Sequence, residues 1–523
     1  MSRFIRPSKY RHVYGQSAKK EHALENVKVT NSAWDTNIVA CSGKYISINW
    51  NASGGGAFAV LPLPSPFGPI NGFPYKLPDT LPLARSHTAA VLDTDWSPHD
   101  DSLVASGGDD GKIMLWKIDS AAFEGWGEDG WVYRDFDPAW RLDASARKVG
   151  QVQWNPCAYG VLASASAGGE HTIKLWDVGH TEDAKIGLTG FGDTIQSMHW
   201  DPTGRFIAAT CRDRKIRLFD PRASKEAVRQ TDGHAGVKGA RIVWMGEERI
   251  GTTGFSKMSE RQIGVWDAGS LSNLKMLSVD QSAGVLMPFW SDNGLLFVAG
   301  KGDGNIRYYE WESDNLFGLA EHKSSDPQRG MCFLPRRSLN VSECEIARAY
   351  KIYGNAVEPI AFIVPRKSDS FQGDLYPPAL AAEPTLQAGE WFSGKVAPPK
   401  LVDFANGAVF LSDGAAKPPP TPITPAVATP STPAPEPIKK SLSTPIPEPP
   451  TPAPVSTSVS QPPPTASAPV ASPSTNDSAL AAENTKLKSE LRDALEKIRK
   501  LEVALEAGRA NARKAAEALL QST

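Results

Sequence analysis

The sequence has no aromatic residue in its last 113 positions. All 15 Trp, 11 Tyr and 19 Phe lie between Phe4 and Phe410. Because large aromatic side chains dominate hydrophobic cores, we expect the packed core within residues 1–410 and not beyond them. At 523 residues, the chain is long enough for more than one domain.

Long apolar runs and paired cysteines are also missing. No stretch of about 18 apolar residues occurs and the first segment is polar, so we expect neither a membrane span nor a secretory leader. The five cysteines are odd in number, and none has the spacing of a CxxC pair or a metal site. We expect buried, reduced thiols in a cytosolic protein, at Cys41, Cys157, Cys211, Cys332 and Cys344.

Catalytic and nucleic-acid-binding signatures are absent as well. The sequence contains no G-x-S-x-G elbow, no P-loop and no metal triad, and the glycines of SGGGAFAV and SGGDDG fit turns. The formal net charge is −2, and no aromatic-basic stripe accompanies it. We therefore expect no enzyme, no cofactor and no nucleic-acid partner.

A repeated pattern fills the aromatic-rich part. An apolar strand, a Gly/Asp turn and a second strand that ends in an aromatic residue recur, as in SGGDDGKIMLW. The closing aromatics are separated by 60, 43, 47 and 43 residues, at Trp116, Trp176, Phe219, Trp266 and Tyr309. A period near 40–45 is typical of WD-repeat propeller blades. Weaker copies at Leu61 and Tyr350 raise the count to seven, so an all-β, seven-bladed propeller is predicted.

Histidine and aspartate near these repeats have a structural interpretation. Asp110 and Asp303 fit tight turns, where the side chain bonds to nearby backbone. His87 and His234 each come shortly before the inner strand of a blade and fit the buried His–Ser–Asp–Trp hydrogen-bond chain of WD repeats. We expect these residues to hold the fold rather than to catalyse.

An insertion with three tryptophans separates the marks at Trp116 and Trp176. Its sequence, FEGWGEDGWVYRDFDPAW, spans residues 123–140. It fits a hydrophobic flap on the propeller surface or a partner-binding loop, and we favour the flap.

Several segments outside the repeat resemble coronins. They are KYRHVYGQ, ASGGGAFAVLPL, CEIARAYKI, EPIAFIVPRKSDSFQGDLYPP and EWFSGKVAPPKL. PRKSDSFQGDLYPP is the most specific, because it is not a repeat element and follows the last blade. The resemblance implies an actin-filament-binding protein with a seven-bladed propeller at 1–355 and a packed C-terminal extension at 356–410. It further implies a variable linker and a C-terminal coiled coil, and the long proline-rich linker is more similar to fungal members.

The segment 411–478 is predicted to be a disordered linker. It holds 20 of the 43 prolines and almost no charge. Pro419, Pro422 and Pro425 form a PxxPxxP run compatible with proline-recognising domains, although a plain spacer is the favoured interpretation. Six Thr-Pro steps suggest proline-directed phosphorylation. The linker has no acidic run, which argues against direct inhibition of the actin-nucleating complex through it.

The segment 479–521 is predicted to be a parallel coiled coil, because apolar residues follow a 3.5-residue period. KIRKLE resembles a trimer-specifying pattern with Lys497 in place of arginine, so a homotrimer is favoured over a dimer. The residues expected to form the oligomer are Leu487, Leu491, Lys497, Ile498, Leu501, Glu502 and Leu505.

The first 28 residues carry seven basic and two acidic side chains, a local charge of +5. Because the actin surface is acidic, a basic patch would attract it. The alternative is that these basic side chains only form a solvated rim on the strand that closes the ring. The resemblance to coronins singles out Lys28, in NVKVT, as a filament contact. The further candidates are Lys9, Arg11, Lys19 and Lys20.

These observations predict a multivalent actin-filament binder and bundler with no chemistry of its own. The resemblance places it in the cytoplasm, on the cytoskeleton at cortical actin patches, with F-actin as partner and the actin-nucleating complex as a further one. The competing hypothesis is a different WD-repeat scaffold or adaptor in vesicle trafficking or signalling, which predicts repeats and a coil but not the extension motif.

Overall fold

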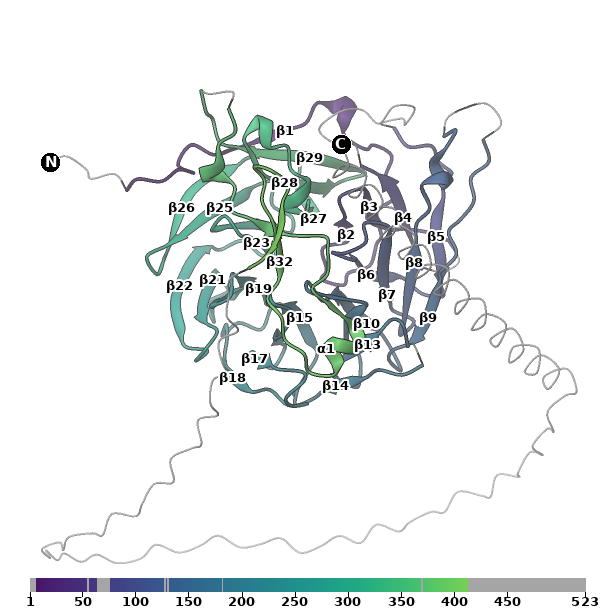
Figure 1. The fold of residues 1–523 in the computed structure, drawn as a ribbon, viewed down its shortest axis with the longest axis horizontal. Helices are drawn as coiled ribbons and strands as arrows, with labels where there is room; N and C mark the ends of the chain where they lie inside the picture. The colour runs from purple at the N-terminus through teal and green to yellow at the C-terminus, as the bar shows by residue number, and fades with distance from the viewer. Residues whose placement is uncertain are drawn as a thin grey trace, which may run out of the picture. The chain divides into compact units, whose positions relative to one another are not determined.

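The computed structural model describes residues 6–53, 56–63, 76–126, 128, 131–180, 182–367 and 370–412. Within these residues, seven four-stranded antiparallel sheets form a ring (Figure 1). None of the described helices is long and apolar enough to cross a membrane. The predicted linker and coiled coil, with the seven oligomerisation residues Leu487 to Leu505, lie outside the described residues apart from 411 and 412.

Each sheet is one blade, and strands are given from the central channel outward. Blade 1 has β2 (Val39–Cys41), β3 (Tyr45–Trp50), β4 (Gly56–Pro62) and β5 (Leu83–His87). Blade 2 has β6 (Val91–Trp96), β7 (Leu103–Gly108), β8 (Lys112–Lys117) and β9 (Trp140–Asp143). Blade 3 has β10 (Val149–Trp154), β12 (Val161–Ser166), β13 (Ile173–Asp177) and β14 (Ile186–Leu188). Blade 4 has β15 (Ile195–Trp200), β16 (Ile207–Cys211), β17 (Lys215–Phe219) and β18 (Arg229–Asp232).

The remaining blades follow the same order. Blade 5 has β19 (Arg241–Met245), β20 (Arg249–Phe255), β21 (Arg261–Asp267) and β22 (Asn273–Asp280). Blade 6 has β23 (Leu286–Ser291), β24 (Leu295–Gly300), β25 (Ile306–Glu312) and β26 (Asn315–His322). Blade 7 has β27 (Gln328–Phe333), β28 (Glu345–Tyr353), β29 (Ala356–Ile363) and β1 (Tyr14–Ser17).

The blades pack face to face because their central strands are apolar on both sides. Every residue of β7 is buried, as expected for a strand covered on both faces. Phe58 of blade 1 meets Trp116 of blade 2 edge to face, with ring centroids 5.3 Å apart. This packing explains why the repeat ends in an aromatic residue.

The predicted hydrogen-bond chain is present in blade 2. His87 Nδ1 lies 3.0 Å from Asp110 Oδ1, and its Nε2 lies 2.8 Å from Ser106 Oγ. Trp116 Nε1 donates to the same Ser106 Oγ over 2.9 Å. In blade 5, His234 Nε2 and Trp266 Nε1 meet at Thr252 Oγ1 instead. Asp303 was predicted to bond to the backbone of its turn, but its carboxylate instead pairs with Arg261 at 2.7 Å.

Blade 7 joins the two ends of the propeller. β1 pairs with β29, from Tyr14 opposite Ile363 to Ser17 opposite Ile360. The predicted mark at Tyr350 is wrong in detail, because Tyr350 lies in β28, the second strand, whereas the other marks lie in third strands. The third strand is β29, so the propeller extends to Ile363 and not only to residue 355. The sequence pattern failed here because β29 does not end in an aromatic residue followed by aspartate.

The start of the insertion at 123–140 packs on the propeller. It contains the 3-10 helix η2 (Ser120–Phe123). The Phe123 ring packs at a tilt against Tyr45 of blade 1, with ring centroids 5.8 Å apart, and Trp126 is buried with its ring centroid 4.7 Å from that of Trp131. The start of the insertion therefore packs as a flap, whereas Val132, Tyr133 and Trp140 are exposed, and the choice between a flap and a partner-binding loop stays a prediction.

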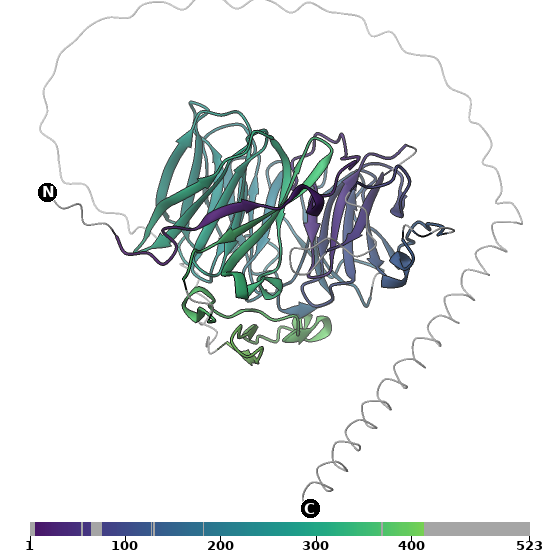
Figure 2. The ribbon, with the colours of Figure 1, turned by 90° about the horizontal axis from the view of Figure 1, so that it is seen from above.

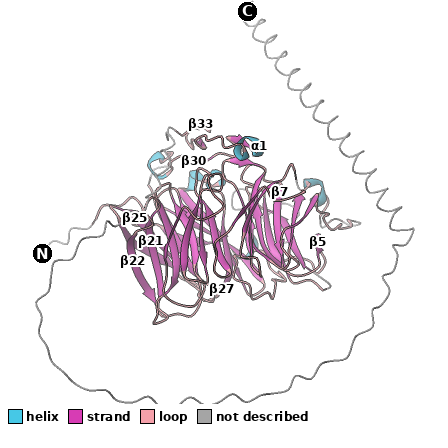
Figure 3. Cartoon of the chain, turned by 90° about the horizontal axis from the view of Figure 1, so that it is seen from below, coloured by secondary structure: helices cyan, strands magenta, loops and turns pink. Residues whose placement is uncertain are grey.

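The extension after β29 covers one face of the ring (Figures 2 and 3). It contains the 3-10 helix η5 (Gly373–Leu375), α1 (Ala388–Phe392), β30 (Ala379–Leu380), β31 (Leu386–Gln387), β32 (Lys400–Val402) and β33 (Val409–Leu411). β31 pairs with β11 (Ala158–Tyr159) of the β10–β12 connection, and the Trp391 indole donates to Gly204 O over 2.8 Å. We call this side the extension face. The 3-10 helices η3 (Arg336–Ser338) and η4 (Val341–Glu343) connect β27 to β28.

Candidate functional site

The N-terminal segment runs along the outside of blade 7 and then crosses to blade 1. After β1 it forms the 3-10 helix η1 (Lys20–His22). Leu24 then bridges to Val357 of β29, and Val29 bridges to Trp50 of β3. The predicted site residues are therefore distributed along the seam that closes the ring (Figure 2).

Lys28 lies at the junction between blades 7 and 1. Its carbonyl accepts a hydrogen bond from Asn51 N at 2.7 Å, which fixes the backbone. Its ammonium donates to the Asp79 carbonyl over 3.0 Å and lies 3.8 Å from the Asp79 carboxylate. The side chain is 44% exposed and that of Asp79 85%, so this pair is well solvated and weak.

Lys9 and Arg11 are engaged within the molecule. The Lys9 ammonium donates to the backbone carbonyl of Asp374 in the extension, and the Arg11 guanidinium donates to the carbonyl of Arg6. Arg6 pairs with Glu310 and Glu312 of β25. These contacts attach the start of the chain to blade 6 and to the extension.

Lys19 and Lys20 are exposed at η1. Lys20 lies 3.3 Å from Glu25 with 78% of its side chain in solvent. The structure therefore does not bring the five predicted residues into one compact site. Lys9 and Arg11 are attached near the extension and blade 6, and Lys28 is at the blade 7–1 junction.

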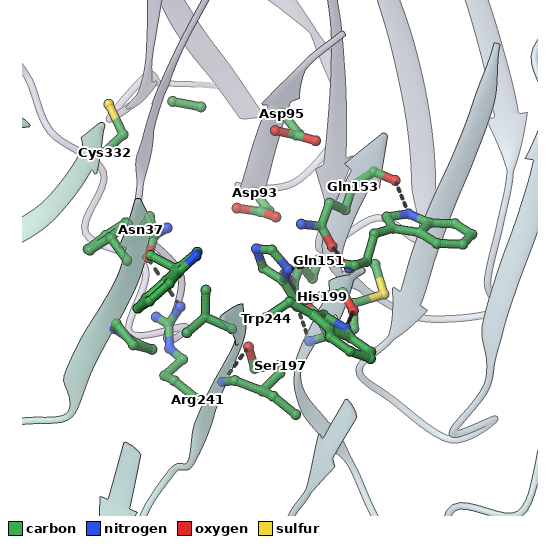
Figure 4. Close-up of a pocket in the computed structure, with 18 of the residues that line it drawn as sticks. Asn37, Asp93, Asp95, Gln151, Gln153, Ser197, His199, Arg241, Trp244 and Cys332 are labelled. Carbon is green, nitrogen blue, oxygen red and sulfur yellow. Dashed lines mark hydrogen bonds between the residues drawn. The ribbon is translucent and has the colours of Figure 1, made fainter. Parts of the chain in front are cut away.

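The inner strands surround a central cavity of about 430 Å³ (Figure 4). Hydrogen bonds link neighbouring inner strands across it through side chains. The Asp93 and Asp95 carboxylates of β6 accept from Val152 N at 3.1 Å and Trp154 N at 2.8 Å in β10. Gln151 of β10 in turn accepts from Met198 N of β15 at 2.8 Å. These side chains take the place of the backbone pairing that separate blades cannot make.

The two aspartates of β6 have unusual proton affinities. Burial raises the pKa of Asp93 to about 7, although the hydrogen bond from Val152 N opposes this rise. Burial raises the pKa of Asp95 to about 8, and the nearby Asp93 charge adds to the rise while the bond from Trp154 N opposes it. Both carboxyl groups therefore change charge near neutral pH.

Asp35 in the same cavity behaves in the opposite way. Burial alone would raise its pKa, but Arg241 and Lys301, each 2.9 Å from Asp35 Oδ1, hold it well below its usual range. In the described part of the chain, no group of three His, Cys, Asp or Glu side chains could hold a metal ion. Burial also raises the pKa of the Cys157 and Cys211 thiols, which keeps them protonated.

The residues of this cavity were not predicted from the sequence. A signal was present in VLDTDW, where two aspartates two residues apart interrupt an otherwise apolar strand. Their partners, Val152 and Trp154, lie 59 residues further along the chain, so the hydrogen bonds follow only from the closed ring.

Comparison with known proteins identifies similar sequences and similar solved structures. Family models match at 3–67 (domain of unknown function, DUF1899), at 80–117 and 185–220 (WD domain, G-beta repeat), and at 357–399 (type of WD40 repeat). The coronin-like protein crn1 of Schizosaccharomyces pombe is 49% identical over 411 residues, which are 77% of this chain and 65% of that protein.

Two further relatives are covered over more of their length. Coronin-A of Dictyostelium discoideum is 43% identical over 78% of this chain and 88% of that protein. Human Coronin-2A is 38% identical over 78% of this chain and 76% of that protein. The crystal structure of the WD40 domain from Toxoplasma gondii coronin superimposes with a TM-score of 0.68 at 28% identity, covering 76% of this chain and 97% of that one.

Proposed function

This chain belongs to the coronin family, and on that premise we propose that it binds and bundles actin filaments as an organiser of the actin cytoskeleton. The match to the fungal relative spans 65% of that protein's length, so the activity of the whole relative is part of the proposal. The observation that carries the proposal is the position of Lys28, which is half-exposed on the rigid junction between the first and last blades.

Lys28 suits a contact with an acidic filament because its backbone is fixed while its charge remains available. Its neighbour Asp79 is almost fully solvated, so a partner carboxylate can replace it at little cost. We propose that Lys19 and Lys20 add long-range attraction from the same seam. Lys9 and Arg11 contribute through the position of the N-terminal segment, because each donates a hydrogen bond to a backbone carbonyl within the molecule.

Multivalency is the second part of the proposal. We propose that Leu487, Leu491, Lys497, Ile498, Leu501, Glu502 and Leu505 form a trimeric coiled coil that joins several propellers. Joined propellers would turn weak, salt-sensitive contacts into avid binding and bridge filaments. The actin-nucleating complex as a further partner and cortical actin patches as the cellular site complete the proposal. For the proline-rich linker we propose a spacer, with binding to proline-recognising domains as the alternative.

Filament co-sedimentation with the full chain tests the Lys28 contact. Lys28→Asp should weaken binding about tenfold at low salt, because a contact charge is reversed. The matched control is Lys117→Asp, since Lys117 is also an exposed lysine beside one aspartate, Asp100. Equal binding by both variants and the unaltered chain would remove Lys28 from the contact. If the unaltered chain does not pellet with filaments, the scaffold or adaptor hypothesis replaces actin binding.

A helix-breaking variant tests the multivalency. Leu501→Pro should separate the propellers and lower both apparent affinity and bundling, because proline interrupts the helix. Glu496→Ala, at an outward heptad position, is the control. Sedimentation equilibrium of the unaltered chain should give three copies, and a monomer would contradict this part of the proposal.

A further inference from the structure

Three neighbouring turns of blades 4 and 5 carry a concentrated positive charge. Arg212 and Arg214 lie in the β16–β17 turn, Lys238 in the β18–β19 loop and Lys257 in the β20–β21 turn. Together with the apolar residues that accompany them, we call this the blade 4–5 basic surface. Its members are Arg212, Arg214, Lys215, Val237, Lys238, Lys257 and Met258.

The three turns form one continuous surface. Gly233 N donates to Arg214 O over 2.7 Å, and Gly236 N donates to Phe255 O over the same distance, so the β18–β19 loop is attached to both flanking turns. The Lys238 ammonium lies 4.7 Å from the centre of the Phe255 ring. The side chains of Arg212, Arg214, Lys215 and Lys238 line a shared shallow hollow.

This surface lies on the face opposite the extension. Gly204, in the β15–β16 turn, touches the extension through Trp391. Because antiparallel strands reverse direction at each turn, the next turn, β16–β17, lies at the other end of the blade. The extension therefore leaves the basic surface uncovered (Figure 3).

Three acidic residues, Asp213, Asp232 and Glu260, lie in or beside the turns of this surface, and Asp232 is opposite Lys215 in the pairing of β17 with β18, but none of them forms an ion pair with these cations. Other basic residues near the turns of this face have acidic partners, such as Lys112 with Asp143 at 2.6 Å and Lys148 with Asp109 at 2.9 Å. In contrast, none of the five cations forms an ion pair with another described residue, and the nearby Asp213 carboxylate is paired with Arg217. Five cations are therefore available to one anionic surface.

Two apolar side chains protrude among these cations. Val237 is 84% exposed and Met258 is 82% exposed, and each adjoins a lysine in sequence. Exposed apolar tips beside unpaired cations suit the boundary between lipid headgroups and acyl chains, where the apolar group inserts and the cation meets phosphate. A rigid acidic protein would account for the cations but gives no reason for apolar tips on two separate loops.

We propose that the blade 4–5 basic surface binds membranes that contain anionic lipids, with Val237 and Met258 inserted between the headgroups. This binding goes beyond the proposed filament contact and uses different blades from Lys28. Since the formal net charge of the chain is only −2, the attraction depends on this local cluster and not on the overall charge.

Vesicle flotation with the full chain tests this inference. The probes are vesicles of phosphatidylcholine alone and vesicles with about 30% phosphatidylserine, in about 0.1 M salt. The chain should float only with the anionic vesicles. Arg212→Glu/Lys257→Glu should lower the partition coefficient at least ~25-fold, because each cation near an anionic surface contributes about a fivefold factor. Val237→Ser/Met258→Ser should lower it about tenfold through lost insertion.

The control is Lys44→Glu/Lys185→Glu, which reverses two exposed lysines in turns at the extension-face ends of blades 1 and 3. It should float like the unaltered chain. The inference is overturned if the unaltered chain does not float with anionic vesicles, if both charge-reversed variants lose binding equally, or if the serine variant binds unchanged. It is also overturned if Arg212→Glu/Lys257→Glu loses filament pelleting but keeps vesicle binding, since the surface is then a filament contact. Filament pelleting that depends on Lys28 is independent of all these results.

Discussion

The N-terminal segment and the blade 4–5 basic surface are both basic, but their charges have different surroundings. Arg6 pairs with two glutamates of β25, Lys9 donates to the extension and Arg11 donates to the backbone. The cations of the blade 4–5 basic surface form no ion pair with another described residue. In the segment that is densest in positive charge along the sequence, Arg6, Lys9 and Arg11 are thus engaged within the molecule, whereas Lys19, Lys20 and Lys28 remain exposed.

This difference separates two uses of the same side chains. A cation with fixed partners closes the ring and contributes to stability, whereas a cation without partners adds little to stability and remains available for binding. Substitution of a paired cation should therefore lower the free energy of unfolding, whereas substitution of an unpaired cation should hardly change it. The largest loss is expected where the ion pair is buried.

Arg261 is a buried cation with two fixed carboxylate partners. It is 1% exposed and bonds to Asp280 at 2.6 Å and to Asp303 at 2.7 Å. Arg261→Ala should lower the free energy of unfolding by about 3–5 kcal/mol, because two carboxylates lose their buried partner. Urea unfolding followed by tryptophan fluorescence measures this. Arg85→Ala, at an exposed pair with Asp135, is the control and should cost less than about 1 kcal/mol. Equal losses would show that burial of the pair does not matter.

The central cavity offers the same comparison among carboxylates. Asp35 has two cationic partners, whereas the pKa of Asp95 is set by burial, by hydrogen bonds from backbone N–H groups and by the nearby Asp93. The folded-state pKa of Asp95, about 8, lies above its ordinary value, so the folded state binds this proton more tightly than the unfolded state does. The stability from this group is full below about pH 4 and is lost as pH rises through 8.

Asp95→Asn should therefore flatten the dependence of the unfolding free energy on pH between 5 and 9, with a change of a few kcal/mol at most. The asparagine carbonyl can still accept the hydrogen bond from Trp154 N. Denaturant midpoints at several pH values, with Asp143→Asn on the exposed edge of blade 2 as control, measure this effect. If the unfolding free energy of Asp95→Asn depends on pH as in the unaltered chain, another group of the cavity is responsible for the pH dependence.

The fold could be predicted because its signals are local and repeated. The closing aromatics at Trp116, Trp176, Phe219 and Trp266 lie in third strands, as the spacing predicts. His87 and Asp110 form hydrogen bonds with residues about 20 positions away in the sequence. Their structural roles could therefore also be predicted. Blade 7 was misread in detail because its third strand, β29, does not end in an aromatic residue followed by aspartate.

The binding surfaces could be predicted only in part. The sequence shows where cations are dense, but a partner such as Glu310 lies 304 residues from Arg6 and cannot be assigned before the ring is closed. Conversely, Arg212, Lys238 and Lys257 are unremarkable in their own segments and form a cluster only because consecutive turns share one face. The long-range ion pairs and the cluster of cations both arise only when the propeller ring closes.

A moderate effect is expected at Arg6. This guanidinium pairs with Glu310 and Glu312 and lies 4.3 Å from the Phe317 ring centre. Arg6→Ala should lower the free energy of unfolding by about 1 kcal/mol, because the pairs are partly solvated, and should loosen the N-terminal segment. Amide hydrogen exchange of β1 reports that loosening. Arg6→Lys, which keeps the charge, should restore part of the protection, and unchanged exchange in Arg6→Ala would contradict the attachment.

The smallest effect on stability is expected at the blade 4–5 basic surface. Arg212→Ala/Lys257→Ala removes two cations that have no ionic partner among the described residues, so the free energy of unfolding should change by no more than about 0.5 kcal/mol. Any change should be a gain, and it should be greater at low salt, because like charges on adjacent turns repel each other and salt screens that repulsion. Urea unfolding at low and high salt measures both points. A loss above about 1 kcal/mol would show that these cations are paired in solution. They would then resemble Arg6, and the contrast between the two basic regions would disappear.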